Sequence, residues 1–214
     1  MDQQLLLLIN RHWTHPVLDQ IMVISSSFDM WWPFLLVGLI AAVIFGNFRT
    51  RAFLLVAGLT IGVTDGLVVD TLKGVFNRPR PHETVEGVRT LDLQKAKPRF
   101  LAIGQPLREE FSELRLPPRT GNSFPSGHAS NNFAVATVLA VFFRRWGWIL
   151  YIPALLVSYS RIYTGSHWPL DVTVSAFIGI GLGLLVPALC DAIWRRWGGK
   201  VFPRWHLAHP TLFT

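Results

Sequence analysis

Charged residues are scarce in this chain. Lysine, arginine, aspartate and glutamate make up 15% of its 214 residues, whereas a soluble domain carries about a quarter. Half of the residues are hydrophobic, and they come in long blocks rather than in the mixed pattern of a surface helix. This composition excludes an ordinary soluble protein and predicts an integral membrane protein.

Cysteine is nearly absent as well. The one cysteine, Cys190, lies in an apolar block and so excludes an intramolecular disulfide. The apolar run Leu5–Ile9 is short and has no basic segment before it, so we expect no cleavable signal peptide. No internal repeat or low-complexity tract divides the chain, and we expect residues 1–214 to form a single domain.

Long apolar blocks account for most of the sequence. A helix needs about 20 apolar residues to cross a hydrocarbon core, and five blocks approach this length: residues 30–47, 52–77, 127–143, 147–163 and 169–194. Several of the nine tryptophans lie near block ends, as in the aromatic belts of membrane proteins. The expected fold class is therefore all-α, an integral membrane bundle of five or six transmembrane helices.

Residues 1–28 have a different character. A short leucine run, a polar break and a short segment of mixed polarity follow one another. We expect this N-terminal segment to contain an interfacial helix that lies on the membrane. A sixth, irregular span is the alternative.

The formal net charge of +7 would suggest nucleic acid in a soluble protein. Here the basic residues gather at block ends, as in Arg49 with Arg51 and Arg144 with Arg145. We therefore expect membrane topology and anionic lipid headgroups, and no nucleic acid, to explain the charge. With alternating spans the basic clusters share one side, which the positive-inside rule makes cytoplasmic. The loop 78–125 is then extracytoplasmic.

Three charged residues interrupt the second apolar block, namely Asp65, Asp70 and Lys73. Each costs about 2.5–3.5 kcal/mol at the centre of a bilayer, so we expect them to face the bundle interior or its outer end. Asp70 and Lys73 are three residues apart, close enough to form an ion pair that aligns helices. A role in binding is the other interpretation.

The stretch Pro125-Ser126-Gly127-His128 begins the third block. Ser126 is a good N-cap, and Gly127 leaves the first amides of the helix open. Such a helix start binds phosphate or a similar oxyanion, and His128 stands next to it as a proton donor. An ordinary capped helix with an incidental histidine is the alternative.

Two further stretches lie on the same expected side of the membrane. Lys73 and Arg80 flank the end of the second block, and their charges suit phosphate oxygens. Arg161 ends the fourth block, while His167 and Asp171 flank the start of the fifth. A carboxylate beside an imidazole fixes its tautomer and leaves the other ring nitrogen as nucleophile or base. Phosphoryl transfer through a phosphohistidine is favoured by this set of groups: two histidines, a carboxylate, three cations and an open helix start.

These residues resemble the motifs of the phosphatidic acid phosphatase type 2 (PAP2) superfamily. Six residues separate Lys73 from Arg80-Pro81, and the stretch Pro125-Ser126-Gly127-His128 follows. Five residues then separate Ser160-Arg161 from His167, and three separate His167 from Asp171. The motifs cover residues 73–171, and no catalytic position departs from the pattern.

The resemblance implies a metal-independent membrane phosphatase that needs no cofactor. It implies that His167 attacks phosphorus, that Asp171 orients His167, and that His128 protonates the leaving oxygen. The phosphate-binding residues would be Lys73, Arg80, Ser126, Gly127 and Arg161.

Bacterial members that this chain resembles act on polyprenyl diphosphates, or on phosphatidylglycerol phosphate and phosphatidic acid. We expect undecaprenyl diphosphate as the substrate and the bacterial inner membrane as the location, with the site on the extracytoplasmic side. A lipid phosphotransferase and a non-catalytic lipid-binding protein are the alternatives. The segment from about Leu91 to Arg119 forms either a short amphipathic lid over the site or a solvated loop with a hydrophobic anchor.

Overall fold

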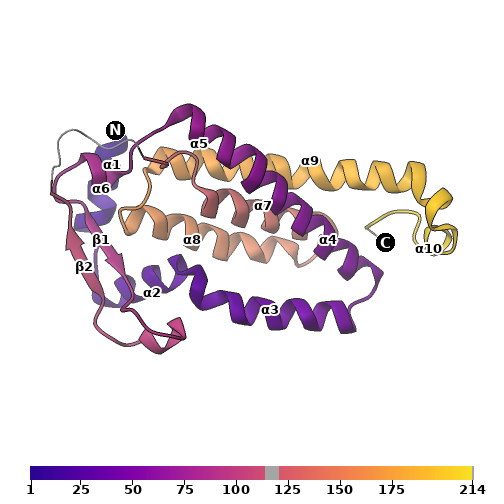
Figure 1. Ribbon diagram of the computed structural model, residues 1–214, viewed down its shortest axis with the longest axis horizontal. Helices are drawn as coiled ribbons and strands as arrows, with labels where there is room; N and C mark the ends of the chain where they lie inside the picture. The colour runs from indigo at the N-terminus through magenta and orange to yellow at the C-terminus, as the bar shows by residue number, and fades with distance from the viewer. Residues whose placement is uncertain (114–120, 214) are drawn as a thin grey trace.

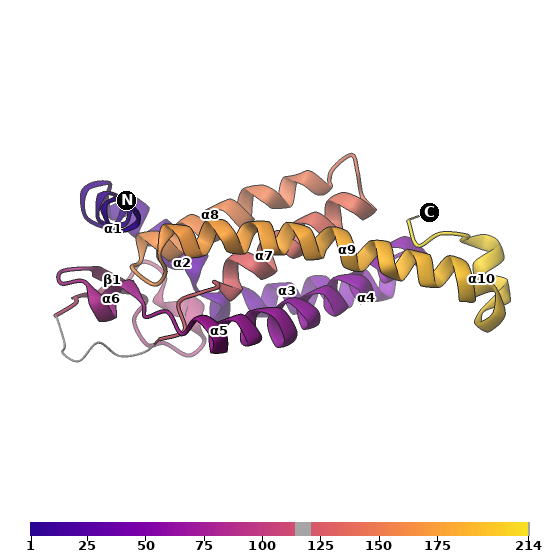
Figure 2. The same ribbon diagram turned by 90° about the horizontal axis from the view of Figure 1, so that it is seen from above.

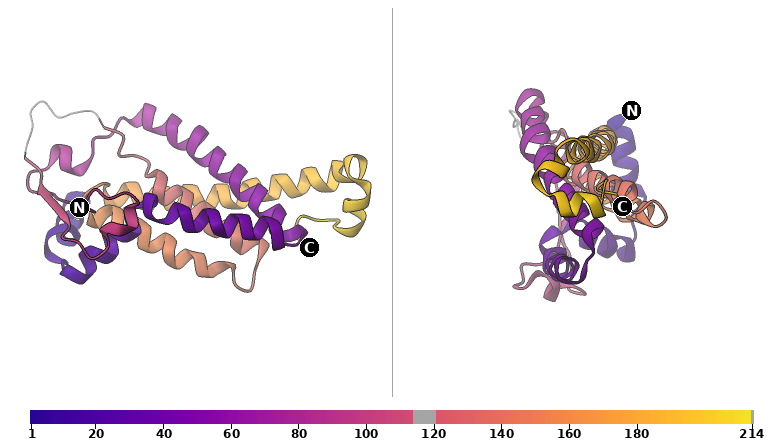
Figure 3. Two further views of the ribbon diagram at one scale, coloured as in Figure 1. Left: turned by 60° about the horizontal axis from the view of Figure 1, so that its bottom comes forward. Right: turned by 90° about the vertical axis from the view of Figure 1, so that its right-hand side faces the viewer.

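The computed structural model describes residues 1–113 and 121–213. The chain is mostly helical, as predicted, and its long helices lie side by side in one elongated bundle (Figures 1 and 2). Viewed along the long axis, they form a single group (Figure 3, right). The helices are α1 (Asp2–Leu7), α2 (Pro16–Ser26), α3 (Phe28–Phe45), α4 (Phe48–Val63), α5 (Asp70–Phe76), α6 (Pro81–Thr84), α7 (Gly127–Phe142), α8 (Tyr151–Tyr163), α9 (Pro169–Val201) and α10 (Pro203–Ala208).

Each of the five long apolar blocks is helical. The second block is α4 and α5, joined without a break by a π-helical turn, Thr64–Val69. Three helical stretches are long and apolar enough to cross a membrane: Phe28–Phe45, Phe48–Thr84 and Pro169–Val201. The other two blocks form shorter helices, since α7 has 16 residues and α8 has 13.

The innermost helix of the bundle is α7. It packs against α9 along much of its length and also against α8 and α4. Two glycines of α9 make the close approach to α7 possible: a Cβ on Gly179 would lie 2.3 Å from the carbonyl oxygen of Ser130, and one on Gly183 would lie 2.6 Å from Cβ of Thr137. A larger side chain at either position would push the two helices apart.

The outer surface of the bundle is apolar. On α3, Val37 is 68% exposed, Phe34 61% and Phe45 86%. Water would disfavour so much exposed apolar surface, whereas lipid chains would cover it. The surface of α3 therefore agrees with the membrane interpretation of the composition.

The N-terminal segment consists of α1, a π-helical turn (Leu8–His12) and α2. It is anchored by Asn10, which is fully buried. Its Nδ2 donates to the carbonyl oxygens of Arg89 and Tyr163, both at 2.7 Å, and its Oδ1 accepts from the amide of Arg89 at 2.8 Å. The segment is thus tied to the end of the bundle where α8 stops and α9 starts (Figure 1).

The loop 78–125 contains a feature that the sequence did not predict. Strands β1 (Arg89–Asp92) and β2 (Arg108–Phe111) form an antiparallel pair in which Arg89 lies opposite Phe111. Between them is a short 3₁₀ turn, Arg99–Ala102, which contacts α3 and buries Ala102. The hairpin lies at the same end of the bundle as α1 (Figure 3, left). The part of the expected lid from Leu114 to Arg119 lies outside the described residues.

The close contact between α7 and α9 leads to a test with a matched control. We expect Gly179→Val to lower the thermal unfolding temperature of the detergent-solubilised protein, because its side chain would clash with the backbone of Ser130. Overpacking of this kind costs about 1–3 kcal/mol. The control is Gly181→Val on the same helix, where a Cβ would meet nothing within 4 Å. Equal unfolding temperatures for the two variants would contradict the close packing.

Candidate functional site

The predicted anion-binding helix start is present at α7. Ser126 is the N-cap, and its hydroxyl lies 3.5 Å from the amide nitrogen of Ala129. The amide of Ser126 donates to Oγ of Ser175 on α9 at 2.7 Å. Among the described residues, the amides of Gly127 and His128 have no acceptor, so two of the expected open N–H groups remain for a ligand.

Gly127 lies against the π-helical turn of the neighbouring helix. A Cβ at this position would stand 3.1 Å from Oδ1 of Asp65 and 3.7 Å from Cγ1 of Val69. The carboxylate of Asp65 is also close enough to act electrostatically on His128. Asp65 is an exposed residue, but its carboxylate is directed toward the start of α7. A π-helical turn is a common feature of functional sites.

His167 lies in the connection between α8 and α9 and is only 3% exposed. Its Nδ1 stands 2.7 Å from the carbonyl oxygen of Ser123. A carbonyl oxygen only accepts, so Nδ1 carries the proton and Nε2 keeps its lone pair. The structure thus presents His167 in the tautomer that a nucleophile requires.

The surroundings of His167 also favour its neutral form. Burial lowers the pKa of His167 well below its usual value, and the positive charges of Arg161 and Arg80 lower it further. A neutral imidazole has a free lone pair for attack, whereas an imidazolium has none.

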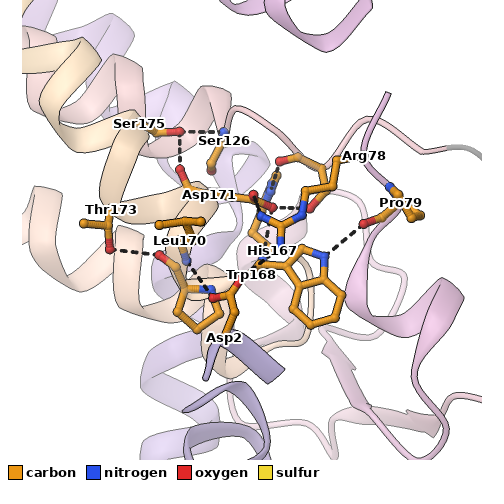
Figure 4. A network of polar contacts seen from close by, with 12 residues as sticks. Asp2, Arg78, Pro79, Ser126, His167, Trp168, Leu170, Asp171, Thr173 and Ser175 are labelled. Atoms are coloured by element: carbon orange, nitrogen blue, oxygen red, sulfur yellow. Dashed lines mark hydrogen bonds and ion pairs between the residues drawn. The ribbon is translucent and has the colours of Figure 1, made fainter. Parts of the chain in front are cut away.

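Asp171 holds His167 differently from the expected direct contact. Its fully buried carboxylate accepts from Oγ of Ser123 at 2.5 Å and from the amide of Trp168 at 3.3 Å, and it forms an ion pair with Arg78. It reaches His167 through Ser123, whose carbonyl oxygen accepts from the ring (Figure 4). The spacing was misleading because His167 precedes the extended N-cap residue Trp168, so residues 167 and 171 do not share a helix face.

Three cations surround the two histidines. The charges of Arg161, Arg80 and Lys73 act on His128, and those of Arg161 and Arg80 act on His167. None of the three forms an ion pair with a described residue. The ion pair considered for Asp70 and Lys73 therefore does not form. Unpaired cations gathered at one site repel one another, and a bound anion would offset this repulsion.

Arg161 and His128 line a cavity of about 630 Å³. Its wall includes Ser26 at the end of α2, whose hydroxyl accepts a hydrogen bond from the guanidinium of Arg161. The Nε of Arg161 is buried without a partner among the described residues, so this side chain still has a donor to offer. The N-terminal segment and the hairpin supply most of the remaining wall.

The structure thus brings all eight predicted site residues to one end of the bundle. Sequence reasoning missed Arg78 and Ser123. Arg78 stands two residues before Arg80 in the same proline-rich turn, and this proximity was an available signal. Ser123 contributes a backbone carbonyl, for which a sequence offers no signal.

The sequence is similar to those of known proteins. A family model described as the PAP2 superfamily matches residues 34–195. The undecaprenyl-diphosphatase BcrC of Bacillus subtilis is 32% identical over 83% of this chain and 77% of its own length. An undecaprenyl-diphosphatase of Sulfolobus acidocaldarius is 46% identical over 34% of this chain and 35% of its own length.

The fold also has a solved relative. The crystal structure of Aquifex aeolicus LpxE matches with a TM-score of 0.58 and 30% sequence identity, over 86% of this chain and 93% of that one. A lipid A 1-phosphatase of Porphyromonas gingivalis is 36% identical over 40% of this chain and 20% of its own length.

The environment of His167 leads to a pH test. We expect its ring to stay neutral as the pH falls through about 6.5, the usual value for histidine, because burial and two arginines disfavour the charged form. The measurement is the pH dependence of the ring NMR signals of histidine-labelled protein, with His167 assigned by the spectrum of His167→Gln. A signal from His167 that titrates near 6.5 in the folded protein would disprove this environment.

Proposed function

Because the chain belongs to the PAP2 superfamily, we propose that it is a membrane enzyme that hydrolyses a lipid phosphate or diphosphate through a phosphohistidine. One observation carries the proposal: two histidines and three unpaired cations lie together at one end of an apolar bundle. This arrangement suits an anion that is attacked by one histidine and loses a group to which the other donates a proton.

The substrate we propose is undecaprenyl diphosphate, which would yield undecaprenyl phosphate and inorganic phosphate. Support comes from the similarity to BcrC, which extends over most of both chains. Phosphatidylglycerol phosphate and phosphatidic acid are the alternative substrates. The lipid A phosphatases among the relatives show that the same family also acts on other membrane lipids.

The reaction we propose has two steps. In the first, Nε2 of His167 forms a bond to phosphorus and the bond from phosphorus to the lipid-side oxygen breaks. His128, which takes up a proton when the negative charge of the substrate offsets the neighbouring cations, gives that proton to the oxygen. In the second, water gives a proton to His128 and attacks phosphorus. The bond to His167 then breaks, phosphate leaves, and both histidines return to their starting states.

The remaining site residues stabilise charge. Lys73, Arg80 and Arg161 hold the nonbridging phosphate oxygens, together with the open amides of Gly127 and His128. Ser126 shapes this helix start through its cap. Asp171 keeps the His167 ring in place through Ser123. No step uses a metal or a cofactor.

The membrane arrangement that we propose has five or six transmembrane helices in one domain, residues 1–214. The basic clusters Arg49–Arg51 and Arg144–Arg145 lie at the opposite end of the bundle from the site. By the positive-inside rule, the site then faces the extracytoplasmic side of a bacterial inner membrane. Residues 1–28 lie at the interface, and the loop 78–125 is extracytoplasmic.

The nucleophile is tested by His167→Ala. We expect this variant to release no phosphate from undecaprenyl diphosphate, because it lacks the ring nitrogen that forms the bond to phosphorus in the proposed first step. The assay uses detergent-solubilised protein, a panel of the three candidate lipids and a chelator, and the unfolding temperature serves as the control for folding. Phosphate release by the folded variant at the wild-type rate would disprove the role of His167.

The leaving-group acid has a separate test. We expect His128→Ala to slow release from lipid substrates by about 10²–10⁴-fold but to slow release from p-nitrophenyl phosphate much less, since p-nitrophenolate leaves without a proton. Equal losses on both substrates would contradict proton donation by His128.

An assay with and without an acceptor lipid distinguishes hydrolysis from transfer of the phosphoryl group to a second lipid. We expect labelled diphosphate lipid to release phosphate without any acceptor lipid. Release that requires an acceptor lipid, with the label recovered on that lipid, would instead identify a phosphotransferase.

A further inference from the structure

Arg78 is a charged residue beside the site that the proposed mechanism leaves without a role. One terminal nitrogen of its guanidinium is paired with Asp171. The other lies 2.7 Å from Oδ2 of Asp2 in α1. The guanidinium carbon also stands 5.1 Å from the centre of the Trp168 ring. Figure 4 shows Arg78 between the two carboxylates, above the indole.

Asp2 has a second contact that ties it to the same place. Its Oδ1 accepts from the amide of Leu170 at 2.9 Å. Leu170 is the second residue of α9, and the first amides of a helix have no partner within it. Asp2 therefore joins the N-terminal segment both to Arg78 and to the start of the helix that carries Asp171.

These contacts continue to the nucleophile. Asp171 accepts from Oγ of Ser123, and the carbonyl oxygen of the same serine accepts from Nδ1 of His167. The carboxylate of Asp171 is fully buried, while the side chains of Arg78 and Asp2 are 31% and 25% exposed. An uncompensated buried carboxylate would be strongly disfavoured, and Arg78 supplies the compensating charge.

We propose that Arg78 is a positioning residue for His167. It holds Asp171, which in turn holds Ser123 and, through it, the ring that attacks phosphorus, and Asp2 fixes Arg78 from the N-terminal segment. This role rests on the function proposed above for His167.

A direct role in phosphate binding fits Arg78 less well. Both terminal nitrogens of its guanidinium are already used by carboxylates, whereas Arg80 and Arg161 form no ion pair with a described residue. A planar guanidinium can hold two carboxylates in a fixed geometry, which an ammonium cannot. Loss of Arg78 should therefore change the rate of the chemical step rather than the affinity for substrate.

The test compares Arg78→Gln, Arg78→Lys and Asp2→Asn with the wild type. We expect Arg78→Gln to lower kcat about 10–100-fold, a range typical of residues that orient a functional side chain without touching the reacting group. We expect KM to stay within about twofold of wild type. Lysine keeps the positive charge but lacks the planar guanidinium that holds two carboxylates, so kcat of Arg78→Lys should lie between those of Arg78→Gln and the wild type. Asp2→Asn should lower kcat less than Arg78→Gln.

Two controls separate positioning from a loss of structure. Arg108→Gln removes a surface arginine that pairs with Glu110, and we expect it to keep wild-type kinetics. For Arg78→Ala, added guanidinium ion should restore part of kcat at concentrations that leave wild-type activity unchanged, because the ion fills the vacated space between the carboxylates.

The outcomes distinguish this inference from the proposed function. Phosphate release by wild type but not by His167→Ala supports the function, and unchanged kcat in Arg78→Gln would then overturn only the role of Arg78. A raised KM at unchanged kcat would also overturn it, since Arg78 would then bind substrate. A lower kcat in Arg78→Ala that guanidinium does not restore would identify a purely structural residue.

Discussion

The site depends on the close packing of α7 against α9. Gly179 and Gly183 let the two backbones approach, and this approach lets Ser175 of α9 accept from the amide of Ser126 at the start of α7. The loop before α7 then runs beside the start of α9, where Ser123 contacts both His167 and Asp171. His167, His128 and the open amides of α7 thus come together because two helices pack without large side chains between them.

Electrostatics favours an anion at this end of the bundle. Burial and neighbouring cations favour a neutral His167, while the same cations remain unpaired and are available to phosphate oxygens. Some arginines of the described chain form ion pairs, as in Arg89 with Asp19 and Arg99 with Asp92. The unpaired cations at the site lie beside two histidines and an open helix start, and this combination favours an anionic ligand there.

Much of this architecture was predictable from the sequence, and the failures have physical reasons. The five apolar blocks are helices because their length and composition leave few alternatives, and the eight site residues lie together because each stands at a helix end on one side. The β1–β2 hairpin was missed because each strand has four residues, and β2 is exposed throughout. The contact expected between His167 and Asp171 was inferred from helical spacing across a segment that is not helical.

The central claim is that His167 attacks a phosphate held by Lys73, Arg80 and Arg161. Vanadate adopts the trigonal geometry of phosphoryl transfer, so a structure of the protein with bound vanadate tests this claim most directly. The expected result is vanadium bonded to Nε2 of His167, with its equatorial oxygens contacted by the three cations and the apical oxygen facing His128. Vanadate bound away from His167, or bonded to another residue, would contradict the claim.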